Sequence, residues 1–170
     1  MPKIIEDIQK LLLEETKKQI KEKGYSNVTI RSIAKECNIG VGTFYNYYSS
    51  KDMIVASFLI EDWKECLLRM ETIIENNSKD LEEIYLLLKK FMYDNETIFK
   101  DSSAKESYNT SFSKWHKVLR KQFASIIIKS LDEKDNKEFL SEFLAESLLV
   151  WCGEGKEYYE LKPIIEVLIK

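Results

Sequence analysis

The sequence predicts an all-α protein, with a small head of short helices at the N-terminus followed by a larger helical body. Three observations support this fold class. The 170 residues include only five glycines and two prolines, which leaves little room for hairpins. Apolar residues make up 44% of the chain, enough to bury a core, and they recur at helical spacing. Two short helical patterns also stand close together, at 29–37 and 41–48.

The first predicted helix carries a stripe of apolar residues separated by Glu and Lys. It runs for roughly five turns and ends at Gly24, because glycine readily takes the left-handed conformation that follows a helix. The stripe consists of Ile4, Ile8, Leu11, Leu12 and Ile20.

The second and third predicted helices form a helix-turn-helix unit. Ile30, Ile33, Ala34 and Cys37 recur at the spacing of one buried helical face, and Thr29 is placed to cap that helix. The residue that follows, Asn38, tolerates the left-handed conformation of a tight turn. The second segment begins with the short residues at 40–43, which would let its backbone approach the edges of DNA bases closely.

A long helix is predicted from Lys51, capped by Ser50, to about Asn76. Four further helices are expected at about 80–94, 104–131, 135–152 and 156–169. The predicted domains are therefore a helix-turn-helix domain over 1–50 and a helical domain over 51–170.

Charge is distributed unevenly between the two regions. The net charge is −3, yet residues 1–51 have a balance of +3 and residues 52–170 a balance of −6. This asymmetry favours a polyanion partner at the head, although chance scatter along a Lys- and Glu-rich chain is an alternative explanation.

The three cysteines, Cys37, Cys66 and Cys152, have neither metal-ligand spacing nor the pattern of a disulfide framework. No apolar run approaches the roughly 20 residues that span a bilayer, and the acidic N-terminus does not resemble a signal peptide. We therefore expect a cytoplasmic protein with no membrane partner, no metal and no cofactor.

The segment 29–52 resembles the DNA-binding signature of the tetracycline-repressor (TetR) family. The matching positions are Thr29, Ile33-Ala34, Gly42-Thr43-Phe44-Tyr45, Tyr47-Tyr48 and Ser50-Lys51-Asp52. With the first helix, the resemblance spans roughly residues 4–60. The chain departs from the family pattern at Asn38, where Gly is usual, and at Gly40, where Ser or Thr is usual. The second departure removes a capping hydroxyl that also often reaches a phosphate.

The resemblance implies a role for each matching residue. Thr29 would offer its hydroxyl or its helix's amides to a phosphate, and Tyr45, Tyr47 and Lys51 would be backbone anchors. Base edges would be read by Val41, Gly42, Thr43 and Asn46. Alternatives remain at three positions: Arg31 either touches phosphate or is simply solvated, and the two tyrosines fit ordinary surface positions as well. Phe44 and Tyr48 are expected in the core.

The body would dimerise and bind an effector, as the resemblance implies. The last two predicted helices have broad apolar faces suited to a four-helix interface between two chains, or to packing within one chain. The candidate interface residues are Phe139, Phe143, Leu144, Leu148, Trp151, Ile164, Ile165 and Leu168. Aromatic residues of the middle helices are candidates for an effector pocket, or else fill the core. They are Trp63, Phe91, Tyr93, Phe99, Tyr108, Phe112, Trp115 and His116.

The sequence thus predicts a DNA-binding transcriptional repressor, a homodimer on a pseudo-palindromic double-stranded operator, released by a small-molecule effector. One alternative is a TetR-like coactivator or protein-regulated factor without small-molecule release. An enzyme is not expected, because the chain has one histidine, no Gly-rich phosphate loop and no metal-binding motif.

Overall fold

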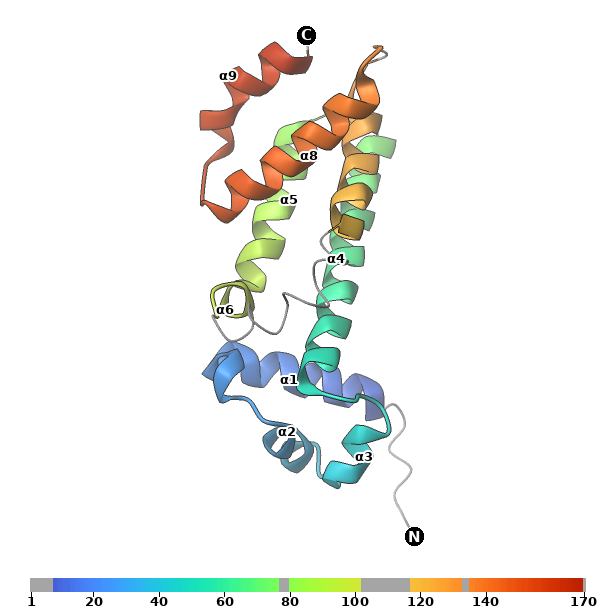
Figure 1. The fold of residues 1–170 in the computed structure, drawn as a ribbon, viewed down its shortest axis with the longest axis vertical. Helices are drawn as coiled ribbons and strands as arrows, with labels where there is room; N and C mark the ends of the chain where they lie inside the picture. Colours follow the sequence, from blue (N-terminus) through green and yellow to red (C-terminus); the bar gives the residue numbers. More distant parts are fainter. Residues whose placement is uncertain (1–7, 77–79, 102–116, 133–134, 170) are drawn as a thin grey trace. The chain divides into compact units, whose positions relative to one another are not determined.

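The protein is helical, as the sequence predicts. The structure is a computed structural model that describes residues 8–76, 80–101, 117–132 and 135–169. Within these ranges the regular elements are helices and none is a strand (Figure 1).

The described helices have the following bounds: α1 (Ile8–Lys23), the 3-10 helix η1 (Tyr25–Asn27), α2 (Ile30–Glu36), α3 (Val41–Tyr45), α4 (Lys51–Glu75), α5 (Leu81–Asp94), α6 (Glu96–Phe99), α8 (Lys137–Gly153) and α9 (Tyr158–Ile169). A further helix covers 117–130.

The chain divides into two compact units, which share α4. The first, here called the head, comprises Met1–Glu61 and Asn95–Asn109. The second, the body, comprises Asp62–Asp94 and Thr110–Lys170. The predicted functional boundary after residue 50 stays a prediction.

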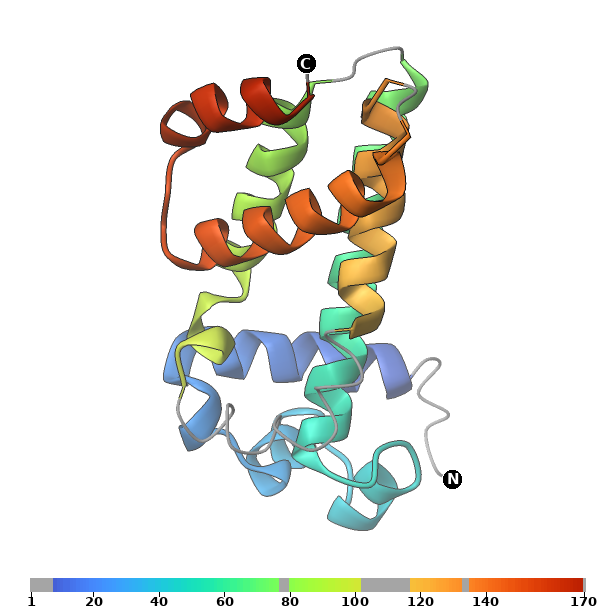
Figure 2. The same ribbon diagram turned by 45° about the horizontal axis from the view of Figure 1, so that its top comes forward.

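In the head, α2 and α3 pack against each other on one side of α1 (Figures 1 and 2). The core between them consists of apolar side chains at the predicted helical spacing, including Leu12, Ile20, Ile33 and Phe44, each no more than 2% exposed. Gly24 has a φ of 78° and a ψ of 156°. The helix α1 therefore ends at the glycine that the sequence predicts, in a positive-φ conformation that glycine adopts readily but outside the left-handed helical region.

In the body, the helix over 117–130 runs alongside the second part of α4 in the same direction (Figure 2). Two contacts define this pairing: Trp63 Nε1 donates to Gln122 Oε1 at 3.1 Å, and Lys129 Nζ lies 3.1 Å from Glu71 Oε1. The last two helices, α8 and α9, both contact α5, and α8 is also joined to the helix over 117–130 by the ion pair of Glu146 with Arg120, at 2.9 Å.

The predicted helices agree with those observed within the described residues, with two differences. The short elements η1 and α6 were not expected, because three or four residues are too few to show a periodic pattern. The third helix stops at Tyr45 rather than Tyr48. After it, the amides of Asn46 and Tyr47 donate to carbonyls three residues back, as in a turn, instead of four residues back, as in an α-helix. The predicted stretch 104–116 lies outside the described residues. No described helix is long and apolar enough to cross a membrane.

Candidate nucleic-acid interface

Thr29 caps α2, as its position predicts. Its hydroxyl accepts from the Ser32 amide at 3.1 Å, and the Ser32 hydroxyl accepts from the Thr29 amide at 3.1 Å. This reciprocal pair satisfies two amides at the helix start. The Thr29 hydroxyl proton is not needed for that bond, so this exposed side chain can still donate to a ligand.

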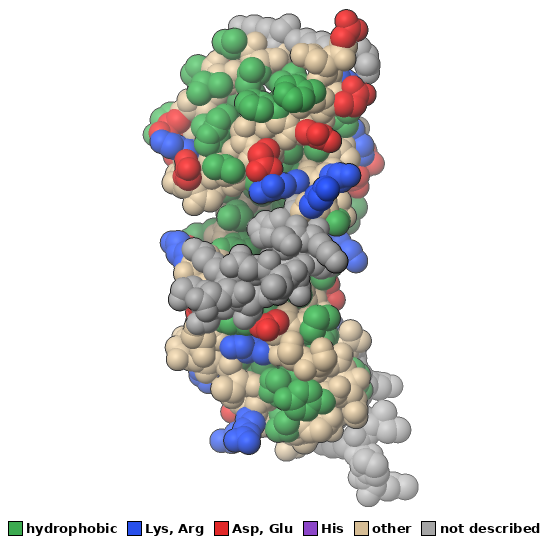
Figure 3. All heavy atoms as spheres, viewed as in Figure 1, with side chains coloured by type: hydrophobic (Ala, Val, Ile, Leu, Met, Phe, Trp, Pro, Cys, Tyr) green, Lys and Arg blue, Asp and Glu red, His purple; other side chains and the backbone are tan. Residues whose placement is uncertain are grey.

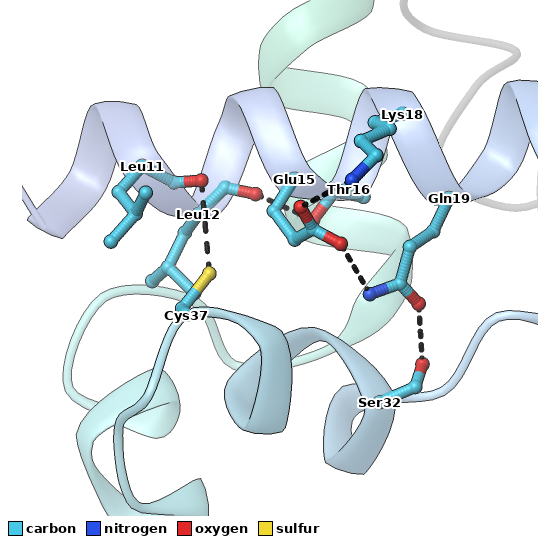
Figure 4. A network of polar contacts seen from close by, with 8 residues as sticks. All are labelled: Leu11, Leu12, Glu15, Thr16, Lys18, Gln19, Ser32 and Cys37. Carbon is cyan, nitrogen blue, oxygen red and sulfur yellow. Dashed lines mark hydrogen bonds and ion pairs between the residues drawn. The ribbon is translucent and has the colours of Figure 1, made fainter.

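A polar network joins this cap to α1 (Figure 4). The Ser32 hydroxyl lies 2.7 Å from Gln19 Oε1 and 2.8 Å from the Thr29 carbonyl oxygen, and its one proton can serve only one of these acceptors at a time. Gln19 Nε2 donates to Glu15 Oε1 at 2.8 Å. Gln19 is 1% exposed, so the amide fixes the register of α2 on α1 from inside the head.

Sequence reasoning missed Gln19, although a signal existed. Thr16 and Gln19 follow Leu12 by four and seven residues, which places both polar side chains on the buried face of α1. Thr16 donates to the Leu12 carbonyl at 2.7 Å. A polar residue at an apolar helical position therefore indicated a buried hydrogen bond.

The turn between α2 and α3 has the geometry that Asn38 predicts. Asn38 has a φ of 54°, and its amide donates to the Lys35 carbonyl at 3.0 Å. Gly40 then precedes α3 with an extended backbone and no side-chain cap. Because glycine has no side chain, α3 begins without a side-chain cap, but the turn before it keeps its left-handed geometry at Asn38.

The ten residues predicted to contact DNA all reach the surface of the head. Thr43 and Lys51 are half-buried and the others are exposed: Thr29, Arg31, Gly40, Val41, Gly42, Tyr45, Asn46 and Tyr47. The tyrosines are 54% and 44% exposed, whereas Phe44 and Tyr48 are 0% and 6% exposed. The two aromatic residues expected in the core are therefore confirmed there, and the exposed tyrosines present their hydroxyls to solvent.

Lys51 makes contacts within the head that the family resemblance did not predict. Its ammonium donates to the Tyr25 carbonyl at 2.9 Å and to the Val28 carbonyl at 3.1 Å. It also lies 3.9 Å from the centre of the Tyr25 ring. Burial lowers the pKa of Lys51, while the nearby carboxylates of Asp52 and Asp101 act in the opposite direction.

The same short helix η1 is held by two carboxylates. The buried Tyr25 donates its phenol proton to Asp52, at the start of α4. Asp101, which follows α6, accepts from the Ser26 amide at 3.2 Å and from the Ser26 hydroxyl at 2.7 Å. These contacts lie within the head, and they join residues 27 and 75 positions apart in the sequence.

The predicted effector-pocket residues fall in different places. Trp63 and Phe91 are buried in the body with ring centroids 5.1 Å apart, and Phe123 packs on Trp63 at 6.2 Å. Tyr93 is 75% exposed on α5, and Phe99 is half-buried in the head. The remaining candidates, Tyr108, Phe112, Trp115 and His116, lie outside the described residues.

The predicted interface residues also separate into two sets. Phe139, Phe143 and Ile164 are exposed by 70%, 44% and 52%, and apolar side chains gather over α8 and α9 in Figure 3. Trp151 and Leu168 are half-buried. The other three, Leu144, Leu148 and Ile165, are at most 1% exposed in the single chain, so they support this surface from beneath.

The thiols and the metal-binding side chains do not form a reactive cluster among the described residues. Cys37, Cys66 and Cys152 are buried and unpaired. Burial raises the pKa of these thiols to about 11, 12 and 11 respectively. In the described part of the chain, no group of three or more His, Cys, Asp or Glu could hold a metal ion.

A capped helix, a left-handed turn and a second short helix with an exposed polar face define a helix-turn-helix motif, joined to a body whose described elements are helices. Residues 12–58 match the family model of the bacterial regulatory proteins of the tetR family. The match includes the signature at 29–52, so the resemblance predicted from that signature is confirmed.

Three known proteins illustrate the similarity. An HTH-type transcriptional regulator of Bacillus subtilis, YuxN, is 41% identical over 51 residues, which are 30% of this chain and 18% of that protein. The fatty acid metabolism regulator protein of the same species is 31% identical over 71 residues, covering 42% and 37% of the two chains. The matches thus span well under half of these relatives' lengths.

The fold as a whole resembles that of a solved regulator. The crystal structure of a transcriptional regulator (TerR/AcrR family) from Aquifex aeolicus superposes with a TM-score of 0.56 at 21% identity, covering 84% of this chain and 83% of that one. At this identity the likeness concerns the fold alone, and it extends beyond the helix-turn-helix head.

Proposed function

We propose that this protein is a sequence-specific DNA-binding repressor, which binds a pseudo-palindromic operator as a homodimer and is released by a small-molecule effector. The observation that carries the proposal is the surface position of all ten residues assigned to DNA contact. Their apolar neighbours in the same motif, such as Ile33 and Phe44, are fully buried. The motif therefore presents its polar side and its smallest side chains to a partner.

The chemistry of this surface suits duplex DNA. Tyr45, Tyr47 and Lys51 supply O–H and N–H donors for phosphate oxygens, which position a protein without reading sequence. Thr43 and Val41 suit the methyl group of thymine, and Asn46 can pair with adenine. An added Cβ at Gly42 would meet no atom within 4 Å, so this side of α3 is open to a close approach.

The exposed apolar surface of α8 and α9 supports dimerisation. Phe139, Phe143 and Val150 on α8, with Ile164 and Val167 on α9, are each 44–76% exposed. Large exposed apolar patches of this kind commonly mark protein interfaces. A two-fold dimer would present two heads to half-sites about one helical turn apart, roughly 34 Å.

Effector release is proposed to act through the aromatic cluster of the body. Trp63 is packed on two rings and hydrogen-bonded to Gln122, so an apolar or amphipathic ligand that enters here must repack it. Such a ligand lowers operator affinity only if it binds the DNA-free dimer more tightly than the DNA-bound one. A coupling of about 1–3 kcal/mol suffices.

Selection of bound duplexes from a random pool tests DNA binding and gives the operator. We expect one enriched, two-fold symmetric sequence whose affinity falls steeply with salt. A protein that enriches no sequence and shows no salt-dependent binding contradicts the proposal and favours a protein-regulated factor.

Gly42→Ala is the sharpest variant for this surface. Within a helix, alanine is more favourable than glycine by about 1 kcal/mol, and the new methyl meets open space in the free protein. We therefore expect greater stability but at least about tenfold weaker operator binding, because the methyl blocks approach to the bases. Gly153→Ala, in α8, is the control and should leave operator affinity unchanged.

Effector release is tested with a panel of apolar and amphipathic molecules. Fatty acids belong in it, because one relative is named as a fatty acid metabolism regulator. Binding is followed by tryptophan fluorescence, and operator affinity is measured with each ligand at saturation. A ligand that saturates the protein but leaves operator affinity untouched argues against release.

A further inference from the structure

The ammonium group of Lys51 is engaged inside the head. Two of its three N–H donors are taken by the carbonyls of Tyr25 and Val28, at 2.9 and 3.1 Å. The charge also lies over the face of the Tyr25 ring at 3.9 Å, a favourable cation–π position. A lysine that served only as a phosphate anchor would need none of these contacts.

The two carbonyls lie at the point where the chain turns from η1 into α2. Tyr25 is the first residue of η1 and Val28 follows its last residue. Tyr25 O accepts from the Val28 amide at a long 3.3 Å, and the Lys51 ammonium supplies its second donor. The residue after Val28 is Thr29, the cap of α2.

Lys51 therefore connects the first residue of α4 to the entry of α2. Val28 is 1% exposed, so its side chain is fixed in the core while its carbonyl is fixed by the ammonium. With both ends of this residue held, the backbone direction into Thr29 is set. The exposed residues that begin α2, Thr29 and Arg31, follow directly from it.

We infer that Lys51 is a positioning residue for DNA binding: by holding the Tyr25 and Val28 carbonyls it orients the start of α2, and its third donor remains for a phosphate. The inference rests on the proposed DNA binding. Lys51 would therefore raise DNA affinity by ordering the start of α2 already in the DNA-free protein.

The first test is amide hydrogen exchange of the full-length, DNA-free protein. Lys51→Met keeps most of the aliphatic length and removes the ammonium. We expect the amides of Val28 and Ser32 to exchange about tenfold faster, as loss of hydrogen bonds to a charged group predicts. Lys51→Arg restores two donors and the cation over the ring, so it should return exchange toward the wild-type rate. Lys35→Met, an exposed lysine of α2, controls for loss of charge.

The second test is a salt series on the selected operator duplex. Loss of a phosphate contact alone flattens the salt slope by about one unit per contact, two per dimer. A positioning role adds a loss that does not depend on salt. We expect Lys51→Met to bind about tenfold more weakly even after the slope change is removed, and Lys51→Arg to recover that part. The Lys35→Met control should show no salt-independent loss.

Three outcomes are decisive. Unchanged exchange at Val28 and Ser32 in Lys51→Met overturns the inference, as does an affinity loss that the salt slope explains completely. If Lys51→Met is not folded by circular dichroism, Lys51→Leu, which also removes every donor, is measured in its place by the same criteria. A wild-type protein that binds no duplex overturns the proposed function instead, a result seen in a separate measurement.

Discussion

Buried polar side chains add specific hydrogen bonds to the apolar core of the head, whereas aromatic rings cluster around Trp63 in the body. In the head, Gln19 contacts Ser32 on α2, and Lys51 contacts two carbonyls next to η1. In the body, Trp63 packs on Phe91 and Phe123. Hydrogen bonds require particular atoms at particular angles, whereas ring packing tolerates many apolar substitutions of similar volume.

The exposed surfaces differ in the same way. The head exposes the side chains of Tyr45, at the end of α3, and of Asn46 and Tyr47, which follow it, while the body exposes apolar side chains along α8 and α9. A directional set of donors suits a partner with fixed acceptors, such as DNA. A broad apolar face suits another apolar face. This contrast indicates that individual side chains of the head are hard to replace, whereas the body requires mainly apolar residues at helical spacing.

The largest expected effect is on the head core. Phe44 is 0% exposed and its ring meets those of Tyr45 and Tyr48. Phe44→Ala should cost about 3–5 kcal/mol of unfolding free energy, because it leaves a cavity. Since the rings of the body are unaffected, we expect amide protection to be lost in α2 and α3 and retained in α5 and α8.

Tyr93→Ala is the control in the body. Tyr93 is 75% exposed on α5 and lies outside the surface proposed for dimerisation, so its truncation should change the unfolding free energy by no more than about 0.5 kcal/mol. Equal losses from the two variants would contradict the contrast drawn between the regions.

A charge in the exposed apolar surface should break the proposed dimer. Phe143→Glu or Ile164→Glu places a carboxylate at a position that is 44% or 52% exposed, and burying it between two chains would cost about 2 kcal/mol or more. Sedimentation should then give a monomer near 20.1 kDa. Leu68→Glu, at a 64% exposed apolar position on α4, is the control and should remain dimeric.

Removing the cap of α2 should have an intermediate effect. Thr29→Ala deletes the hydroxyl that accepts from the Ser32 amide, at a cost of about 1 kcal/mol. The loss should appear as faster exchange in α2, with no change in the body. Thr97→Ala, at an exposed position within α6, should stay within about 0.5 kcal/mol of the wild type.

The smallest expected effect concerns the thiols. Folding raises their pKa from 9.0 to about 11 for Cys37 and Cys152 and to about 12 for Cys66. The folded state thus holds these protons more tightly than the unfolded chain. The resulting stability is fully present below pH 9 and is lost as pH rises through 11 to 12.

Disulfide reagents measure this directly, because only the thiolate reacts. At pH 8 we expect the native thiols to react far more slowly than the unfolded chain. Rapid labelling of Cys66 in the native protein would contradict its buried position, and Cys66→Ala identifies its share of the signal.

The two regions were also unequally predictable from the sequence. Thr29, Asn38 and Ser50 act within a few residues of their own positions, and all three behave as predicted: a cap, a left-handed residue with φ 54°, and a cap whose hydroxyl accepts from the Met53 amide at 3.2 Å. The fold class and the helix pattern of the described body follow from apolar spacing.

Contacts between distant segments were not predictable in this way. The Lys51 contacts with η1 span 23 and 26 residues, and the Asp101 contacts span 75. Nothing local distinguishes Lys51 from an exposed lysine. Likewise, apolar spacing places Phe143 and Leu144 side by side in sequence without telling which one faces solvent, yet their exposures are 44% and 0%.

The Asp101 contact with Ser26 has a practical consequence for grafting this head onto another protein. A chimera cut after residue 61 would carry all of the helix-turn-helix but would leave the Ser26 amide and hydroxyl without their carboxylate acceptor. The face of α1 that contacts α6 would be bare as well. A grafted head must therefore include two stretches of chain, with the segment around 95–101 joined to residues 1–61 by a linker or by circular permutation.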